Sequence, residues 1–138
     1  MTMSATLDHR PGRAMLWTGR IVSGILVALL LTDAAMKLVI VQPVIDASAQ
    51  LGWPTDPVTV RTLGAILAPS TLFYALPRTA VLGAILLTGY LGGAIATHLR
   101  IADPLFTHTL FGVYVGVALW GGLWLRDRRI RALIPLAH

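Results

Sequence analysis

The residues best suited to chemistry in this chain gather in a short stretch between two long apolar runs. Residues 97–108 read THLRIADPLFTH and contain two histidines, an arginine and an aspartate. Histidine can exchange a proton near neutral pH, while aspartate can orient it and arginine can stabilise a developing negative charge. The stretch is therefore either an ordinary polar turn or one wall of a site, and the elements that flank it decide which.

A second pair of ionisable residues lies inside the first apolar run. Asp33 is followed by Lys37 one helical turn later, so the two side chains share a helix face and are expected to pair. An aspartate near the centre of a membrane helix costs about 2.5 to 3.5 kcal/mol, which a partner, a cavity or protonation must offset. Packing alone does not explain these two residues.

The composition identifies the apolar runs as membrane spans. Of the 138 residues, 56% are hydrophobic and only 12% are charged, against roughly a quarter charged in soluble proteins, and the mean hydropathy is +0.75. The net charge of +5 comes from basic residues at span ends rather than on a soluble face, so no nucleic-acid partner is expected. The chain has no cysteine, which excludes disulfides, thiolate metal sites and thiol nucleophiles.

Four apolar runs are long enough to cross a bilayer as helices of roughly 20 residues. They cover about residues 17–41, 58–76, 79–99 and 104–125. Because no alternating strand pattern is present, we expect an all-α, integral membrane four-helix bundle made by a single domain, residues 1–138. Gln42 and Pro43 are expected to end the first helix, and Asp103 before Pro104 is expected to cap the fourth.

The basic residues set the expected orientation. Eight of the eleven lie on one side of a four-span topology, and the positive-inside rule then puts this side and both termini in the cytoplasm. The eight are Arg10, Arg13, Arg20, Arg78, Arg126, Arg128, Arg129 and Arg131. The alternative is that the first run is a cleaved signal peptide, which would leave three spans.

This topology brings ionisable residues of all four helices to one layer on the extracytoplasmic side, while the other half of the bundle is expected to be apolar apart from Arg20. The candidate catalytic residues, if the chain is an enzyme, are Asp33 and His98. The candidate ligand-binding residues are Lys37, Arg61, Arg100 and His108, and Asp103 is assigned to the helix cap. The alternative is that these side chains only hydrogen-bond and cap helix ends. No metal site is expected, because no ligand pair has metal-site spacing and three basic residues oppose a dication.

Small residues recur at four-residue spacing in the third and fourth runs. Gly89, Gly93 and Thr97 share one helix face, and so do Gly112 and Gly116. Such spacing lets another helix backbone approach closely. We expect these faces to pack within one bundle, with a homo-oligomer seam as the alternative.

Several longer motifs resemble the DoxX-like family of small bacterial four-helix membrane proteins. They are LPRTAVLGAILLTGYLGGAIATHLRIADPLFTH followed by LWGGLWLRD, with SGILVALLLTDAAMKL and LGWP upstream. The resemblance covers about residues 20–135 and implies a multi-pass protein of the bacterial inner membrane. It also implies recurring polar positions that match Asp33, Lys37, His98, Arg100 and Asp103. The family takes its name from a small membrane subunit of a thiosulfate:quinone oxidoreductase, although a chain without cysteine is poorly suited to direct sulfur transfer.

Two classes of function are compatible with these residues. In the first, the polar layer binds a quinone or another lipophilic small molecule, with Lys37 or Arg61 hydrogen-bonding a carbonyl, and a soluble or membrane oxidoreductase partner supplies electrons. In the second, the chain is a small membrane-embedded enzyme of the isomerase, hydratase or hydrolase type. A transporter is a third reading, but one four-helix chain without an internal repeat would have to oligomerise. We favour the binding subunit because the resemblance points to it.

Overall fold

The computed structural model describes residues 12–134, and helices make up most of this part of the chain. In order they are α1 (Arg13–Val39), α2 (Gln42–Gln50), α3 (Pro57–Ala75), α4 (Ala80–Arg100), a π-helical turn (Leu105–Thr109), α5 (Phe111–Arg126) and α6 (Arg128–Leu133). Four stretches are long and apolar enough to cross a membrane, namely α1, α3, α4 and the π-helical turn together with α5. The predicted all-α membrane bundle is confirmed.

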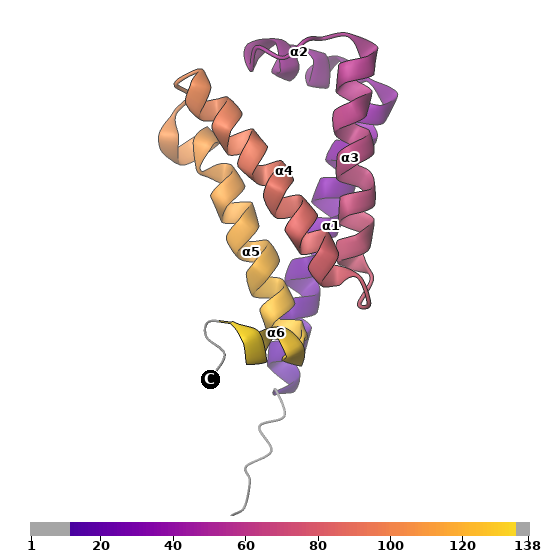
Figure 1. Ribbon diagram of the computed structural model, residues 1–138, viewed down its shortest axis with the longest axis vertical. Coiled ribbons are helices and arrows are strands. Elements are labelled where there is room, and N and C mark those ends of the chain that lie inside the picture. The colour runs from indigo at the N-terminus through magenta and orange to yellow at the C-terminus, as the bar shows by residue number, and fades with distance from the viewer. Residues whose placement is uncertain (1–11, 135–138) are drawn as a thin grey trace, which may run out of the picture.

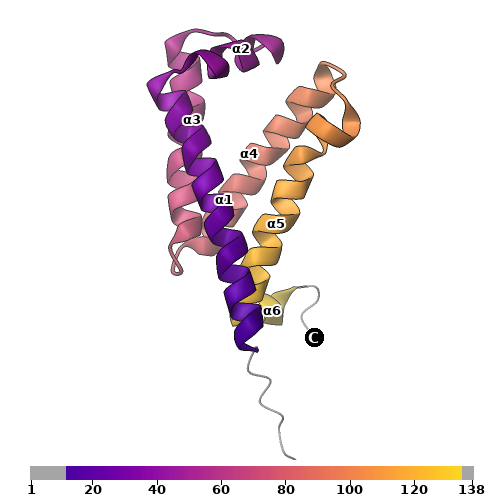
Figure 2. The ribbon, with the colours of Figure 1, turned by 180° about the vertical axis from the view of Figure 1, so that it is seen from behind.

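The long helices form two pairs that meet at one end and diverge toward the other (Figure 1, and from behind in Figure 2). α1 packs against α3 and α4 against α5, while contacts of α1 with α5 and of α3 with α4 join the pairs. We call the meeting end, with Arg20, Arg78 and Arg126, the basic end. The opposite end, with Lys37 and Arg100, is the outer end, and the positive-inside rule predicts that it faces away from the cytoplasm.

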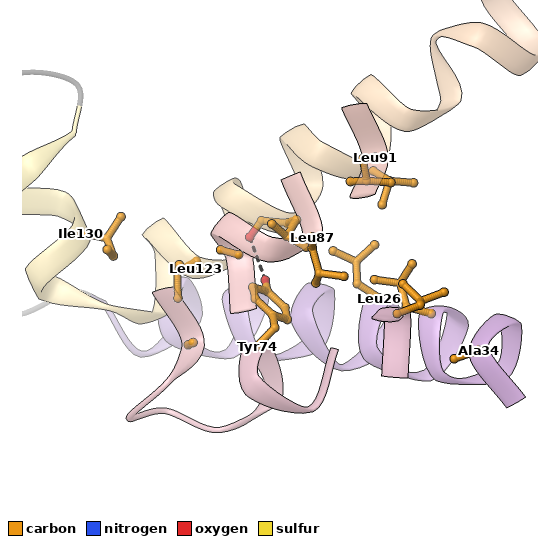
Figure 3. Close-up of a cluster of buried hydrophobic side chains, with 13 residues drawn as sticks. Leu26, Ala34, Tyr74, Leu87, Leu91, Leu123 and Ile130 are labelled. Carbon is orange, nitrogen blue, oxygen red and sulfur yellow. Dashed lines mark hydrogen bonds between the residues drawn. The ribbon is translucent and has the colours of Figure 1, made fainter. Parts of the chain in front are cut away.

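The best-packed part of the bundle lies where the two helix pairs meet. Leu26 of α1, Leu87 of α4 and Leu123 of α5 belong to one cluster of buried side chains (Figure 3). On α4 no residue beyond Leu91 is buried, which matches the divergence of the helix pairs toward the outer end. Because lipid tails are as apolar as leucine, close packing rather than escape from water holds these helices together.

A buried tyrosine joins three of the helices in this cluster. The Tyr74 hydroxyl donates to the backbone oxygen of Leu119 at 2.7 Å (Figure 3). It also lies 3.1 Å from Ser23 Oγ. Gly83 lets α4 approach α3 so closely that a Cβ at this position would lie 2.1 Å from Tyr74 N. The half of the bundle at the basic end was expected to be apolar apart from Arg20, and this expectation was wrong, because it buries the hydroxyl groups of Tyr74 and Ser23. Hydrogen bonds inside the bundle offset the cost of burying these hydroxyls.

The glycines of α4 and α5 differ in what they contact. Gly112 of α5 packs on the Leu91 backbone, where a Cβ would lie 3.3 Å from the carbonyl oxygen. Gly89, Gly92 and Gly93 of α4 have nothing within 4 Å of a Cβ built on them. The close helix approach predicted at Gly89 and Gly93 is therefore absent among the described residues, and a seam with a second copy stays a prediction.

The sequence did not predict α2. α1 ends at Val39, and Ile40 takes the left-handed conformation with φ 62°, donating its N–H to Met36 O. Gln42 and Pro43, which were expected only to end the first helix, instead open α2. Proline fits the first turn of a helix because its missing N–H would have had no helical partner there. α2 projects sideways from the outer ends of α1 and α3 toward the side of the other helix pair (Figures 1 and 2).

Candidate functional site

The predicted pairing of Asp33 with Lys37 is confirmed. Lys37 Nζ donates to Asp33 Oδ1 one turn away on α1. The lysine side chain is 17% exposed and the aspartate 42%. An ammonium group has three N–H donors, and Asp33 is the only described residue that accepts one of them. The remaining donors have no described acceptor, and they lie in the last turn of this apolar span.

α3 fixes the position of this ion pair. A Cβ on Gly64 would lie 3.0 Å from both Lys37 Cβ and the carbonyl oxygen of Ala34, so glycine lets α3 pack directly against α1 here. About one turn earlier, Arg61 Nε donates to the backbone oxygen of Leu38 at 3.3 Å. That carbonyl lies in the last turn of α1, where the backbone oxygens have no helical N–H groups from which to accept hydrogen bonds. Arg61 therefore adjoins the pair and binds a helix end rather than a carboxylate.

Tyr90 of α4 comes within electrostatic range of Asp33 on α1. It is half-buried, and its hydroxyl makes no hydrogen bond to another described residue. Tyr90, Ala94 and His98 follow one another at four-residue intervals and so share a face of α4. Sequence reasoning missed Tyr90, because an aromatic residue within a span usually packs. Its helical spacing from His98 was the available signal.

His98 and Asp103 meet because of the way α4 ends. Asp103 N donates to His98 O and Ala102 N donates to Leu99 O, each at 3.1 Å, while Ala102 has a left-handed φ of 56°. These are the two bonds of a Schellman motif, which brings the side chains at its ends into contact. Here that contact is polar, since His98 Nδ1 donates to Asp103 Oδ2 at 2.6 Å.

Asp103 does not cap the following helix as predicted. Pro104 stands at the start of the next helical segment, and no side chain accepts a hydrogen bond from its first turn. The Schellman motif turns the carboxylate back toward His98 instead. The chain then makes a π-helical turn, in which Leu110 N donates to Leu105 O at 2.8 Å, before α5 begins.

His108 and Arg100 lie beside this histidine and aspartate pair. The ring centroid of His108 is 6.1 Å from that of His98, and its Nδ1 is 2.8 Å from Thr107 Oγ1. Arg100 donates from Nη2 to the backbone oxygen of Leu51 at 2.8 Å, in the connection between α2 and α3. Arg100 thus links the outer end of α4 to the other helix pair and does not meet a carboxylate.

The side chains predicted to form one layer fall into two groups of contacts. Asp33, Lys37 and Tyr90 form an inner group, whereas His98, Asp103 and His108 form an outer group. Two turns of α4 separate Tyr90 from His98, about 12 Å at 1.5 Å per residue. Within residues 12–134, no hydrogen bond or ion pair joins the two groups directly. The same part of the chain holds no cluster of three or more His, Asp or Glu side chains placed for a metal ion.

The comparison with known proteins gives one match. The model of the DoxX-like family matches residues 21–122, a segment that contains both polar groups and spans most of the chain. No curated protein and no solved structure matches. The chain therefore belongs to the DoxX-like family.

Proposed function

We propose that the chain binds a quinone or a similar lipophilic molecule at the inner group, as a membrane subunit of an oxidoreductase system. One observation carries the proposal: within the membrane spans, Lys37 holds hydrogen-bond donors without described acceptors beside its carboxylate partner Asp33, and the Tyr90 hydroxyl on α4 makes no described hydrogen bond. Polar groups left unpaired in hydrocarbon are costly. A carbonyl of a bound lipophile would pair with either donor.

The inner group suits a molecule that gains and loses protons. A quinone presents carbonyl oxygens when oxidised and hydroxyl groups when reduced, so it accepts from Lys37 or Tyr90 in one state and donates to Asp33 in the other. The Asp33 side chain is 42% exposed and can take part in such an exchange. His98 and His108, two turns further out, would pass protons between this depth and the outer surface.

In this proposal an oxidoreductase partner supplies the electrons, since the chain has no cysteine to act as a redox group. The quinone supplies the redox chemistry, and the protein supplies binding and proton transfer. An oxidoreductase partner in the bacterial inner membrane is the part of the proposal that rests on the family resemblance.

A second candidate is a membrane-embedded enzyme, and the contact between His98 and Asp103 favours it. A carboxylate on Nδ1 orients the imidazole and leaves Nε2 to act as general base or acid. In this candidate Lys37, whose one described partner is Asp33, would stabilise an oxyanion. This reading requires turnover of a lipophilic substrate, whereas the binding subunit requires none.

Tyr90→Phe tests the binding proposal with a matched control in the same chain. Tyr114→Phe removes the same hydroxyl from α5, where the side chain is 50% exposed on the lipid-facing surface. We expect Tyr90→Phe to weaken the affinity for a short-chain quinone about three- to tenfold, as for loss of one hydrogen bond, and Lys37→Met to weaken it about tenfold or more, as for a charged donor. Tyr114→Phe should bind like the wild type.

The binding measurement is a titration of purified protein in maltoside detergent, with mass spectrometry of lipophiles extracted from the same preparation. Equal affinity in all four proteins would rule out the inner group as the site.

His98→Ala and Asp103→Asn test the enzyme candidate. If the protein is an enzyme, both variants should abolish its pH-dependent turnover and leave its affinity for quinone unchanged. If the wild-type protein turns over no lipophilic ketone, ester or alkene, the enzyme candidate is ruled out.

A further inference from the structure

The basic end holds a cavity that the proposed function does not use. Its volume is about 400 Å³, and it lies between α1, the turn joining α3 to α4, and the junction of α5 with α6. Four arginines and one aspartate line it: Arg20, Arg78, Arg126, Arg129 and Asp127. We call this cavity the arginine pocket.

The charges of the arginine pocket are unbalanced. Four guanidinium groups face one carboxylate, and that carboxylate is already engaged, because Asp127 Oδ1 accepts from Arg129 N at 2.9 Å as the cap of α6. Within residues 12–134, none of the four guanidinium groups forms an ion pair with a carboxylate. Like charges around one cavity repel each other, and water and salt screen the three exposed arginines only in part. An anion in the pocket would relieve this repulsion.

Arg126 shows where an acceptor is missing. Its Nη2 donates to the backbone oxygen of Tyr74 at 2.8 Å, and its guanidinium lies 4.8 Å over the Tyr74 ring. Its Nε is buried and has no hydrogen-bond partner in the described part of the chain. A buried charged donor without an acceptor is costly. Because Tyr74 is itself fixed by bonds to α1 and α5, the arginine is held in place before any ligand arrives.

We propose that the arginine pocket binds a phosphate group at the membrane interface. The planar guanidinium pairs its donors with phosphate oxygens in a fork-like geometry, and several arginines around one cavity are typical of phosphate recognition. The pocket lies at the ends of the membrane spans, which is the depth of phospholipid headgroups. Arg20 also lies 5.7 Å over the ring of Trp17, an exposed tryptophan of the kind that marks this interface.

A second cavity indicates which molecule carries the phosphate. It has a volume of about 420 Å³, is formed by residues 76–79, and shares Pro77 and Arg78 with the arginine pocket. Its other walls are Leu76 and Thr79. An anionic phospholipid has a phosphate for the first cavity and apolar acyl chains for the second. Inorganic phosphate would occupy only the first.

Two substitutions test the pocket on the full-length protein. Arg20→Gln with Arg78→Gln removes two exposed lining arginines that make no described hydrogen bond, and Arg13→Gln removes an arginine of the same end that does not line the pocket. Native mass spectrometry with phosphatidylglycerol, and separately calorimetry with inorganic phosphate, measures binding in a phosphate-free maltoside detergent. We expect the double variant to bind phosphatidylglycerol about 25-fold more weakly, at about fivefold per arginine, and Arg13→Gln to bind it almost as the wild type does.

The outcomes separate the two sources of phosphate. Arginine-dependent binding of phosphatidylglycerol without binding of inorganic phosphate supports a phospholipid site, and arginine-dependent binding of inorganic phosphate supports a site for a free phosphorylated molecule. If Arg13→Gln weakens binding as much as the loss of one pocket arginine is expected to, or if neither ligand binds, the arginines only fix topology and the proposal is wrong.

Arg126→Lys keeps the charge but lacks Nε, so it should also weaken binding. Unchanged melting temperatures show that each variant is folded.

Discussion

At the scale of single residues, the local contacts follow from sequence spacing and the long-range ones do not. Asp33 and Lys37 are one helical turn apart, and such a separation requires only that the segment be helical. The position of Tyr90 relative to Asp33 depends on how the two helix pairs pack together, which no local pattern encodes. The contact of His98 with Asp103 depends on a left-handed Ala102, whereas this motif most often uses glycine.

The ion pair gives the first prediction. Asp33→Asn leaves the half-buried ammonium of Lys37 without its carboxylate, so we expect it to lower the free energy of unfolding by about 1 to 3 kcal/mol. Lys37→Met alone should cost a similar amount, while the double variant should recover much of the loss because no unpaired charge remains. Equilibrium unfolding in mixed detergent measures all three. If the loss of unfolding free energy in the double variant equals the sum of the losses in the two single variants, Asp33 and Lys37 are not directly coupled.

At the scale of elements, the helix ends show why part of the predicted site was misplaced. The sequence DP before an apolar run is typical of a helix cap, and Asp56 before Pro57 forms one, accepting from Thr59 N at 3.0 Å. Asp103 before Pro104 has the same sequence but bonds to His98. The difference lies in the preceding residues, since Asp103 also closes the end of α4. The sequence Asp-Pro alone does not show whether the aspartate will cap the following helix or bond to a residue of the preceding one.

The glycines of α4 give a prediction with an internal control. Gly83→Ala would place a Cβ 2.1 Å from Tyr74 N, so α3 and α4 must separate. We expect a loss of about 1 to 3 kcal/mol or more, as for other overpacked positions. Gly89→Ala meets open space, and the higher helix propensity of alanine should leave stability unchanged or raise it by up to about 1 kcal/mol. Thermal unfolding compares them, and equal effects would contradict the packing described for α3 and α4. Destabilisation by Gly89→Ala alone would instead indicate a second copy at that face.

The cap of α3 gives a prediction with a pH dependence. Hydrogen bonds from Thr59 lower the pKa of Asp56 below its usual value. A lowered pKa in the folded state means that the stabilisation is present above the usual carboxyl pKa and is lost as the pH falls through the lower, folded value. Asp56→Asn should therefore reduce the melting temperature near neutral pH and make progressively less difference on acidification. Asp46→Asn is the matched control, because Asp46 only accepts from Gln42 on the exposed side of α2. A pH-independent difference between Asp56→Asn and the wild type would contradict the charged cap.

At the scale of the whole molecule, the four spans were predictable because their signal is length and apolar composition, which the bilayer imposes on any helix that crosses it. The divergence of the helix pairs was not, since it depends on which faces pack. Gly64 and Gly83 pack closely, and so does Gly112, whereas Gly89 and Gly93 share the four-residue spacing of Gly112 with Gly116 and contact nothing described. Small residues permit a close approach without requiring one. Both proposed sites follow from this shape, one near each end of the bundle.

The orientation of the bundle decides which compartment each site faces, and it gives the last prediction. The charge bias predicts that the outer end lies outside the cytoplasm and the basic end lies within it. In this cysteine-free chain, Thr55→Cys and Ala102→Cys place single thiols at exposed positions of the outer end, and Ala132→Cys places one on the exposed side of α6. In intact cells, a membrane-impermeant maleimide should label the first two and not the third, and all three should react after lysis. The reverse pattern would turn the inner group toward the cytoplasm and the arginine pocket away from it. The arginine pocket would then lie in the leaflet that contains less anionic lipid, where its positive charge would find fewer phosphate-bearing ligands.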